Sequence, residues 1–220
     1  INSDDPRQFR KQDGELRSAT ANMSRMQNVD PLAYQQSLVK NRIKELKSDL
    51  PHLYGWNQYQ WAKEFIESKN RMNLLCAANQ IGKSSAAIIK NIEWACNKKL
   101  WPEIWDNEPS QFWYFYPNDS TASSEVMKKW VPEFLPKGNM KHHELYGWDI
   151  EQHGGDVSAI HFRSGVSIYF KTYGQKVLNL QSSTVHMITA DEEMPEEFIN
   201  ELLARLRANR GIFNQVFTAT

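Results

Sequence analysis

The hydrophobic and polar residues between positions 30 and 50 follow the pattern of an amphipathic helix. Hydrophobic residues recur there at steps of three, four or seven, which places them on one helical face: Leu32, Val39, Ile43, Leu46 and Leu50. Asp30 followed by Pro31 is typical of a helix start, because aspartate caps the first N–H groups and proline suits the first turn. Pro51 ends the pattern. We therefore predict one helix over this stretch.

The segment before this helix, residues 1–29, has a different composition. It contains few large hydrophobic side chains among many aspartate, arginine, glutamine and serine residues. Such a segment cannot bury enough hydrophobic surface to offset its loss of conformational entropy. We predict a flexible arm here, so that residues 1–50 form an N-terminal extension with a helix at its end and residues 51–220 form the domain.

From residue 57 onward, helical and strand patterns alternate along the chain. The predicted helices run from Asn57 to about Asn70, from Gly82 to before Pro102, from an Asp119 or Ser120 cap to Trp130, and over 195–209. The predicted strands are a buried run at 72–78, then 112–116, a hairpin of 160–162 and 166–170, then 185–190 and 212–218. Residues 131–156 lack a clear period and are expected to form an irregular insertion. Strands separated by helices predict an α/β fold with a mostly parallel sheet and helices on both faces.

Length, composition and charge exclude several classes of protein. The chain has 220 residues, 40% hydrophobic, which is enough for one domain and an extension. Its 26 basic and 26 acidic residues cancel, so any contact with DNA must be a local patch. No hydrophobic run approaches the roughly 20 residues of a membrane span. Two cysteines, Cys76 and Cys96, lack zinc-site spacing and are expected to be reduced thiols of a cytosolic protein.

The strongest chemical signal follows the predicted strand at 72–78. Residues 77–84 match a phosphate-binding P-loop with alanine in place of the first glycine. Gly82 lets the backbone approach phosphate, Lys83 reaches the terminal phosphates, and Ser84 offers a hydroxyl to Mg²⁺. The sequence therefore predicts an ATP site, whose members are Ala78, Asn79, Gln80, Ile81, Gly82, Lys83, Ser84 and Ser85. A chance Gly-Lys-Ser is disfavoured because the tripeptide lies between a strand and a helix.

A second signal ends the predicted strand at 185–190. Asp191 and Glu192 follow it directly, as a Walker B motif requires. The aspartate would hold the shell of Mg²⁺, and the glutamate would act as the catalytic base on an attacking water. The alternative is an acidic helix start, since Glu193, Glu196 and Glu197 also lie there. Combined with the P-loop, the motif favours ATP hydrolysis, with Glu193 as an electrostatic neighbour.

Three segments in this order, residues 76–84, 189–193 and 217–220, resemble the ATPase domain of tailed-bacteriophage terminase large subunits. The resemblance covers about residues 50–220. It implies a motor in the host cytoplasm that pumps double-stranded viral DNA into a procapsid, working as a homo-oligomeric ring with a portal protein and a small terminase subunit. It also implies a coupling motif at Thr218, Ala219 and Thr220, which senses the γ-phosphate. The family's nuclease domain would follow Thr220, so no nuclease activity is expected from these residues.

The same resemblance places an adenine contact near residues 58–61. A glutamine amide can pair with adenine, for which we favour Gln60 over Gln58, and Tyr59 or Trp61 can stack on the base. Many family members carry an arginine at the position of Asn79. Phosphoryl transfer gains from such an arginine, so another residue must supply the charge and turnover in isolation is expected to be slow. Candidates to supply it to the site of a neighbouring subunit are Arg163, Arg205, Arg207 and Arg210. The alternative is that each is an ordinary surface or helix-end arginine.

Other interpretations stay open from the sequence. A superfamily 2 helicase-type motor shares the Asp-Glu and Thr-Ala-Thr patterns, and a degenerate P-loop is also compatible with an assembly subunit that binds ATP without hydrolysis. His142, His143 and His153 have no regular metal-ligand spacing, which favours exposed loop histidines. A cluster of lysines either contacts a DNA backbone or forms a solvated surface: Lys128, Lys129, Lys137 and Lys141.

Overall fold

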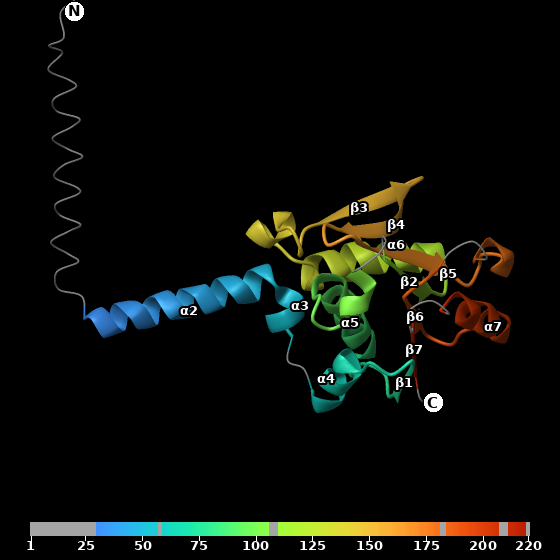
Figure 1. Cartoon of the computed structure of the whole chain (residues 1–220), viewed down its shortest axis with the longest axis horizontal. Coiled ribbons are helices and arrows are strands. Elements are labelled where there is room, and N and C mark those ends of the chain that lie inside the picture. Colours follow the sequence, from blue (N-terminus) through green and yellow to red (C-terminus); the bar gives the residue numbers. More distant parts are fainter. Residues whose placement is uncertain (1–29, 57–58, 106–109, 181–183, 207–210, 219–220) are drawn as a thin grey trace, which may run out of the picture. The chain divides into compact units, whose positions relative to one another are not determined.

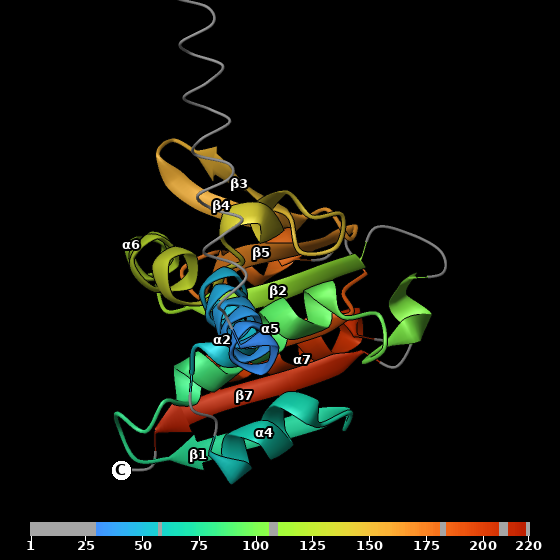
Figure 2. The same cartoon turned by 90° about the vertical axis from the view of Figure 1, so that its left-hand side faces the viewer.

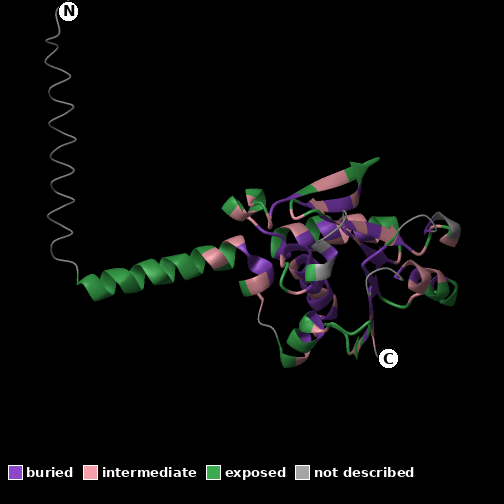
Figure 3. Ribbon diagram, viewed as in Figure 1, coloured by how far each residue is buried: buried purple, intermediate pink, exposed green. Residues whose placement is uncertain are grey.

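The computed structural model describes residues 30–56, 59–105, 110–180, 184–206 and 211–218 (Figure 1). The chain divides into one unit that ends at Glu45 and a second that begins at Leu46. Helix α2 (Pro31–Asp49) begins where the sequence predicts it, and the Asp30 carboxylate accepts a hydrogen bond from the Leu32 N–H at 3.0 Å. None of its residues is buried (Figure 3). Within the described ranges, no helix combines the length and apolar character needed to cross a bilayer.

Seven strands of the described residues form a single sheet in the order β1-β7-β6-β2-β5-β4-β3. Figure 2 shows β1 and β3 at its two edges. Their bounds are β1 (Met72–Ala77), β2 (Ser110–Tyr116), β3 (Trp148–His153), β4 (Asp156–Phe162), β5 (Val166–Thr172), β6 (Met187–Asp191) and β7 (Ile212–Thr218). The pairs from β1 to β5 are parallel, and β4 and β3 continue the sheet as antiparallel strands. The predicted turn at residues 163–165 joins β4 to β5.

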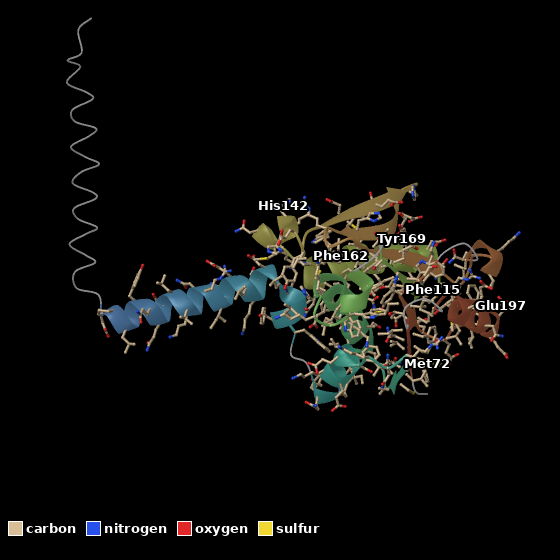
Figure 4. All side chains as sticks on the ribbon, viewed as in Figure 1. Met72, Phe115, His142, Phe162, Tyr169 and Glu197 are labelled. Atoms are coloured by element: carbon tan, nitrogen blue, oxygen red, sulfur yellow. The ribbon has the colours of Figure 1, made fainter. Side chains whose placement is uncertain are left out.

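Helices cover both faces of this sheet. The α-helices of the second unit are α3 (Pro51–Tyr54), α4 (Gln60–Glu67), α5 (Lys83–Cys96), α6 (Asp119–Glu125) and α7 (Glu196–Arg205). Shorter 3₁₀ turns are η1 (Pro102–Trp105), η3 (Gly138–His142) and η4 (Val177–Leu180), and η2 (Val126–Phe134) is a π-helix. Successive side chains of β2 point to opposite faces. Tyr114 joins a core with α5 and η2, whereas Phe115 (labelled in Figure 4) joins a core with α7. The predicted α/β fold is therefore confirmed.

The prediction of a buried strand at residues 72–78 is wrong in one respect. Strand β1 lies at the edge of the sheet, and Met72 and Leu74 are 55% and 69% exposed. Asn73 is instead the buried residue of this strand. A short hydrophobic run indicates a strand but does not say whether that strand is central or at an edge, because pairing is decided by distant residues.

The prediction of an irregular insertion at 131–156 is also wrong. The π-helix η2 continues through Pro132, and residues 148–153 form β3 against β4. The Leu135 N–H bonds to the Trp130 carbonyl, five residues back, at 2.8 Å. This wider pairing replaces the α-helical bond pattern that proline interrupts. The helix before it is capped by Asn118, whose side chain accepts from the Thr121 N–H, rather than by either predicted residue.

Two other predicted boundaries fall partly outside the described residues. The helix predicted from Asn57 to about Asn70 is described as α4, which begins at Gln60 and ends at Glu67; Asn57 lies outside the described ranges. The last predicted helix, 195–209, is described as α7 up to Arg205, and residues 207–210 lie outside. Both cysteines are free, as their spacing predicts; Cys76 is exposed and Cys96 is buried.

A fully buried lysine connects α5 to α4. Lys90 Nζ donates hydrogen bonds to the carbonyl oxygens of Phe65, at 2.7 Å, and Ser68, at 2.8 Å, at the end of α4. Burial lowers the pKa of Lys90 from 10.5 to about 7, because hydrophobic surroundings disfavour the charged form. A neutral amine keeps two N–H donors, so it can serve both carbonyls in either protonation state.

We expect the chain to gain about 2 kcal/mol of stability between pH 7 and pH 9 relative to a Lys90→Met variant. The unfolded chain keeps a proton on Lys90 up to about pH 10.5, whereas the folded chain releases it above about pH 7. Rising pH therefore favours the folded state between about pH 7 and pH 10.5. The free-energy cost of burying Lys90 is largest below pH 7, where the folded chain must bury its charged form. Urea unfolding of both proteins at the two pH values measures the difference. An equal free-energy difference at pH 7 and pH 9 would show that Lys90 does not titrate as described.

Candidate nucleotide-binding site

The loop between β1 and α5 has the backbone of a phosphate-binding turn. Gly82 caps α5 in the left-handed region with φ of 93°, and Gln80 is also left-handed with φ of 63°. A Cβ added to Gly82 would lie 2.8 Å from Trp56 Cζ2. Glycine is thus required here both by the backbone angle and by the indole packed against it. The start of α5 directs its free N–H groups toward this loop.

Lys83 is held inside this loop. Its side chain is 8% exposed, and Nζ donates to the carbonyl oxygens of Ala77, at 2.8 Å, and Ala78, at 2.6 Å. These bonds keep the ammonium close to the turn through which the loop passes. From this position the Lys83 ammonium can contact an anion bound at the start of α5.

The structure brings the P-loop and the acidic motif together. Ser84 Oγ donates to Asp191 Oδ1 at 3.2 Å, and Tyr114 Oη donates to Asp191 Oδ2 at 3.1 Å from the neighbouring strand β2. Burial raises the pKa of the Asp191 carboxyl, and the two hydrogen bonds and the charge of Lys129 partly oppose this rise. Ser84 and Asp191 are 107 positions apart in the sequence. Their contact supports one shared site, in which a lysine lies near a carboxylate and a hydroxyl whose oxygens can bind a metal ion.

Glu192 has an unusual backbone. It follows β6 with φ of 70°, a left-handed conformation that costs energy for a residue with a side chain. Gln215 Nε2 on β7 donates to the Glu192 carbonyl at 2.6 Å and helps to hold this conformation. The Glu192 side chain is exposed at the carboxyl end of the sheet. Strain of this kind is concentrated at functional sites, and Glu192 lines the cavity described below.

Strand β7 lies between β1 and β6, so its end reaches both motifs. Thr218 Oγ1 donates to Asn79 Oδ1 of the P-loop at 3.0 Å. The side chain of Asn79 in the P-loop is therefore bonded to the predicted coupling segment. The other two residues of that segment, Ala219 and Thr220, lie outside the described residues.

A cavity of about 340 Å³ joins these groups, within the roughly 300–1,000 Å³ of small-molecule sites. Its described lining contains most of the predicted residues together with Lys129, Val216 and Phe217: Asn79, Gln80, Gly82, Lys83, Ser84, Ser85, Asp191, Glu192 and Thr218. Ala78 is not in this lining, but its carbonyl accepts from Lys83.

A second cavity, of about 470 Å³, shares Gln80 and Gly82 with the first. It is lined by three aromatic side chains and three loop residues: Trp56, Tyr59, Trp61, Gln80, Ile81 and Gly82. The rings of Tyr59 and Trp61 stack with centroids 6.3 Å apart. Gln60 is not in this lining, and its amide donates to Glu64 Oε1 at 2.9 Å. Gln58 lies outside the described residues.

A buried polar network lies beneath the site and was missed from the sequence. Thr189 Oγ1 on β6 accepts from Asn91 of α5 at 2.8 Å and from Asn214 of β7 at 3.2 Å. Asn214 in turn accepts from Asn73 of β1 at 3.0 Å. The network connects the P-loop strand, the P-loop helix and the strand before Asp191. The sequence signal that could have predicted this network is an asparagine within an otherwise hydrophobic strand, as at Asn73 and Asn214, because a buried amide needs hydrogen-bond partners.

Other predicted groups lie away from the cavities. Arg163 Nη1 donates to the His142 carbonyl at 3.2 Å, and Arg205 forms an ion pair with Glu201 at 2.6 Å. Neither arginine is among the described lining residues of either cavity, and Arg207 and Arg210 are outside the described residues. Across the described ranges, no group of three or more His, Cys, Asp or Glu residues is arranged to hold a metal ion. The prediction of loop histidines is wrong for two of the three, because His142 is the last residue of η3 and His153 the last residue of β3.

A mostly parallel sheet whose strand β1 leads through a Gly-Lys-Ser turn into α5, with an acidic pair at the end of β6, is the fold of a P-loop NTPase. Residues 74–220 match the family model described as "Terminase large subunit, T4likevirus-type, N-terminal". This range is more than half of the chain. The chain therefore belongs to the terminase large subunit family, and its described residues form the ATPase-domain fold of that family.

A solved structure of a large terminase has the same fold. The large terminase of a thermophilic bacteriophage matches with a TM-score of 0.52 and 13% identity over 74% of this chain and 39% of its own. Also similar is an ADP complex of a terminase from the same phage, with a TM-score of 0.48 and 15% identity over 72% of this chain and 38% of its own. A mutant ATPase domain of the Thermus phage P74-26 large terminase matches with a TM-score of 0.45 and 17% identity over 76% of this chain and 67% of its own. The chain spans about two fifths of the first of these terminases. No curated protein matches it.

Proposed function

We propose that this chain is an Mg²⁺-dependent ATPase, the motor domain that drives double-stranded viral DNA into a procapsid. The observation that carries the proposal is the contact of Ser84 with Asp191 beside Lys83 and Glu192 in one cavity. Family membership supports the link to DNA packaging. The same membership supports, as further parts of the proposal, a portal protein and a small terminase subunit as partners, a homo-oligomeric working ring, and action in the host cytoplasm.

The residues present fit a magnesium ion. Mg²⁺ prefers oxygen ligands and is commonly bound by one or two protein groups, several waters and substrate phosphates. Ser84 Oγ and the Asp191 carboxylate, 3.2 Å apart at the cavity, supply such oxygens, and Tyr114 orients the carboxylate. When bound, the ion neutralises charge on the β- and γ-phosphates.

The remaining groups divide the work of hydrolysis. Lys83 leaves its bonds to the loop carbonyls and binds the β- and γ-phosphate oxygens. Glu192 accepts a proton as the oxygen of water bonds to the γ-phosphorus; the bond to the bridging oxygen breaks, and ADP takes its electron pair. The adenine of ATP occupies the aromatic cavity, where Tyr59 or Trp61 stacks on it. Gln60 can form hydrogen bonds with adenine if its bond to Glu64 opens. The coupling segment, Thr218, Ala219 and Thr220, senses whether the γ-phosphate is present and transmits this to the parts of the motor that hold DNA.

Phosphate release from ATP by the purified chain tests the proposal. We expect slow turnover in isolation that needs Mg²⁺ and stops when EDTA removes it. Nucleotide binding can be followed in the same samples through the total tryptophan fluorescence, to which Trp56 and Trp61 of the aromatic cavity contribute. Binding without phosphate release would indicate an assembly subunit instead. Separation of the strands of a forked duplex would favour a helicase and contradict DNA packaging.

A further inference from the structure

A second positive charge lines the first cavity from an element outside the three sequence motifs. Lys129 belongs to the π-helix η2 and lines the cavity together with Lys83, Asp191 and Glu192. It is not among the described residues of the aromatic cavity. Lys129 therefore lies on the side of the acidic pair, where the proposed water and γ-phosphate meet, and away from the proposed base.

The backbone that carries Lys129 is firmly placed. The next residue, Trp130, is fully buried, and its indole N–H donates to Tyr116 Oη at 2.8 Å. The Trp130 ring also packs edge-on against Tyr114, with centroids 5.1 Å apart, and Tyr114 is bonded to Asp191. Lys129 is thus connected to Asp191 through buried aromatic side chains. A π-helical turn at this position is notable because such turns are frequent at functional sites.

The chemistry of the site calls for such a charge. The transition state of phosphoryl transfer carries negative charge on the γ-phosphoryl oxygens, and a cation placed against it accelerates the reaction strongly. Asn79 is neutral and bonded to Thr218, and neither Arg163 nor Arg205 is among the described residues that line the cavity. Among those lining residues, Lys83 and Lys129 carry the positive charge.

We infer that Lys129 is a catalytic residue that contacts the γ-phosphoryl oxygens of ATP from within the same chain. The inference rests on the proposed function, that this site hydrolyses ATP. Lys129 neither gives nor takes a proton: the proton of the attacking water goes to Glu192, and the electron pair of the broken bond leaves with ADP. Lys129 stabilises the charge on the three γ-oxygens while these bonds change.

The test compares ligands with and without a γ-phosphate. The dissociation constants of ATPγS and ADP, each with Mg²⁺, are measured by tryptophan fluorescence for the parent chain and for the variants Lys129→Ala, Lys129→Gln and Lys129→Arg. We expect Lys129→Ala and Lys129→Gln to weaken ATPγS binding about tenfold or more and ADP binding less than about twofold, because a charged hydrogen bond to the γ-phosphate is lost. Lys129→Arg should retain most of the ATPγS affinity. Lys128→Ala, the exposed neighbour, is the control and should behave as the parent.

Each other outcome has a definite meaning. Equal weakening of ATPγS and ADP would show that Lys129 acts through Asp191, and unchanged binding of both would show a surface lysine; both results overturn the inference. The expected loss of ATPγS binding in the Lys129 variants, together with no phosphate release by the parent chain, would support the contact of Lys129 with the γ-phosphate. The same result would refute the hydrolysis proposed above. A parent that binds neither nucleotide refutes both. Where hydrolysis occurs, Lys129→Ala should also lower kcat about a hundredfold or more.

Discussion

Replacing Glu192 with glutamine is expected to lower ATP turnover about a hundred- to ten-thousandfold while changing the dissociation constant of ATP less than about threefold. Glutamine has nearly the shape of glutamate but cannot accept the proton of the attacking water. The left-handed backbone at this residue and the bond from Gln215 to its carbonyl involve only main-chain atoms of residue 192. The exchange should therefore leave the site folded and able to bind nucleotide.

Glu193→Gln is the matched control for this variant. Glu193 is the next residue, is also exposed, and its replacement removes the same charge from the neighbourhood without altering the described cavity lining. Steady-state phosphate release and fluorescence titration of both variants separate catalysis from binding. If Glu192→Gln hydrolyses ATP as fast as the parent, or if Glu193→Gln is the slower variant, the catalytic base is assigned to the wrong carboxylate.

Replacing Lys83 with alanine is expected to weaken ATP binding about a hundredfold. The ammonium is held at the phosphate-binding turn, and losing charged hydrogen bonds to two phosphates costs about 3 kcal/mol or more. Alanine also frees the carbonyls of Ala77 and Ala78, which now accept from Nζ. The Ala77 carbonyl lies at the half-buried end of β1 and the Ala78 carbonyl in the exposed loop after it, so water can replace the lysine and the cost to folding is small.

Titration of ATP against Lys83→Ala, with Lys99→Ala as the control, measures this loss. Lys99 is an exposed lysine just beyond the end of α5, so its replacement removes a charge of the same sign near the same helix. An unchanged affinity in Lys83→Ala would show that the loop does not bind phosphate. Urea unfolding of both variants should give similar midpoints, which separates a binding effect from a folding effect.

The strands and helices with strong local signals were predictable, because each depends on neighbouring residues. The turn into α5 is an example: Gly82, Lys83 and Ser84 follow a hydrophobic run, and their spacing alone specifies a loop that can bind phosphate. The acidic pair after β6 is another. Where the pattern was ambiguous the prediction failed, as for the edge position of β1 and for the helix that continues through Pro132.

Residues that act through distant contacts were not predictable from one sequence. Tyr114 is one of five consecutive aromatic residues at 112–116, and nothing in that run shows which of them contacts Asp191. Trp56 packs against Gly82 from a separate segment. The cluster that contains Lys129 could be interpreted only as a DNA contact or a solvated surface. In each case the partner lies far along the chain.

The sequence by itself determined the P-loop, the acidic pair, the alternation of helices and strands and the family to which the chain belongs, because these reside in short segments with their own chemistry. Only the tertiary structure decided that β7 lies between β1 and β6, that Thr218 bonds to Asn79, and that Lys129 faces the cavity. The physical reason is that strand order and helix packing depend on the burial of side chains from the whole domain. Local periodicity records which face of an element is hydrophobic, but not which element covers it.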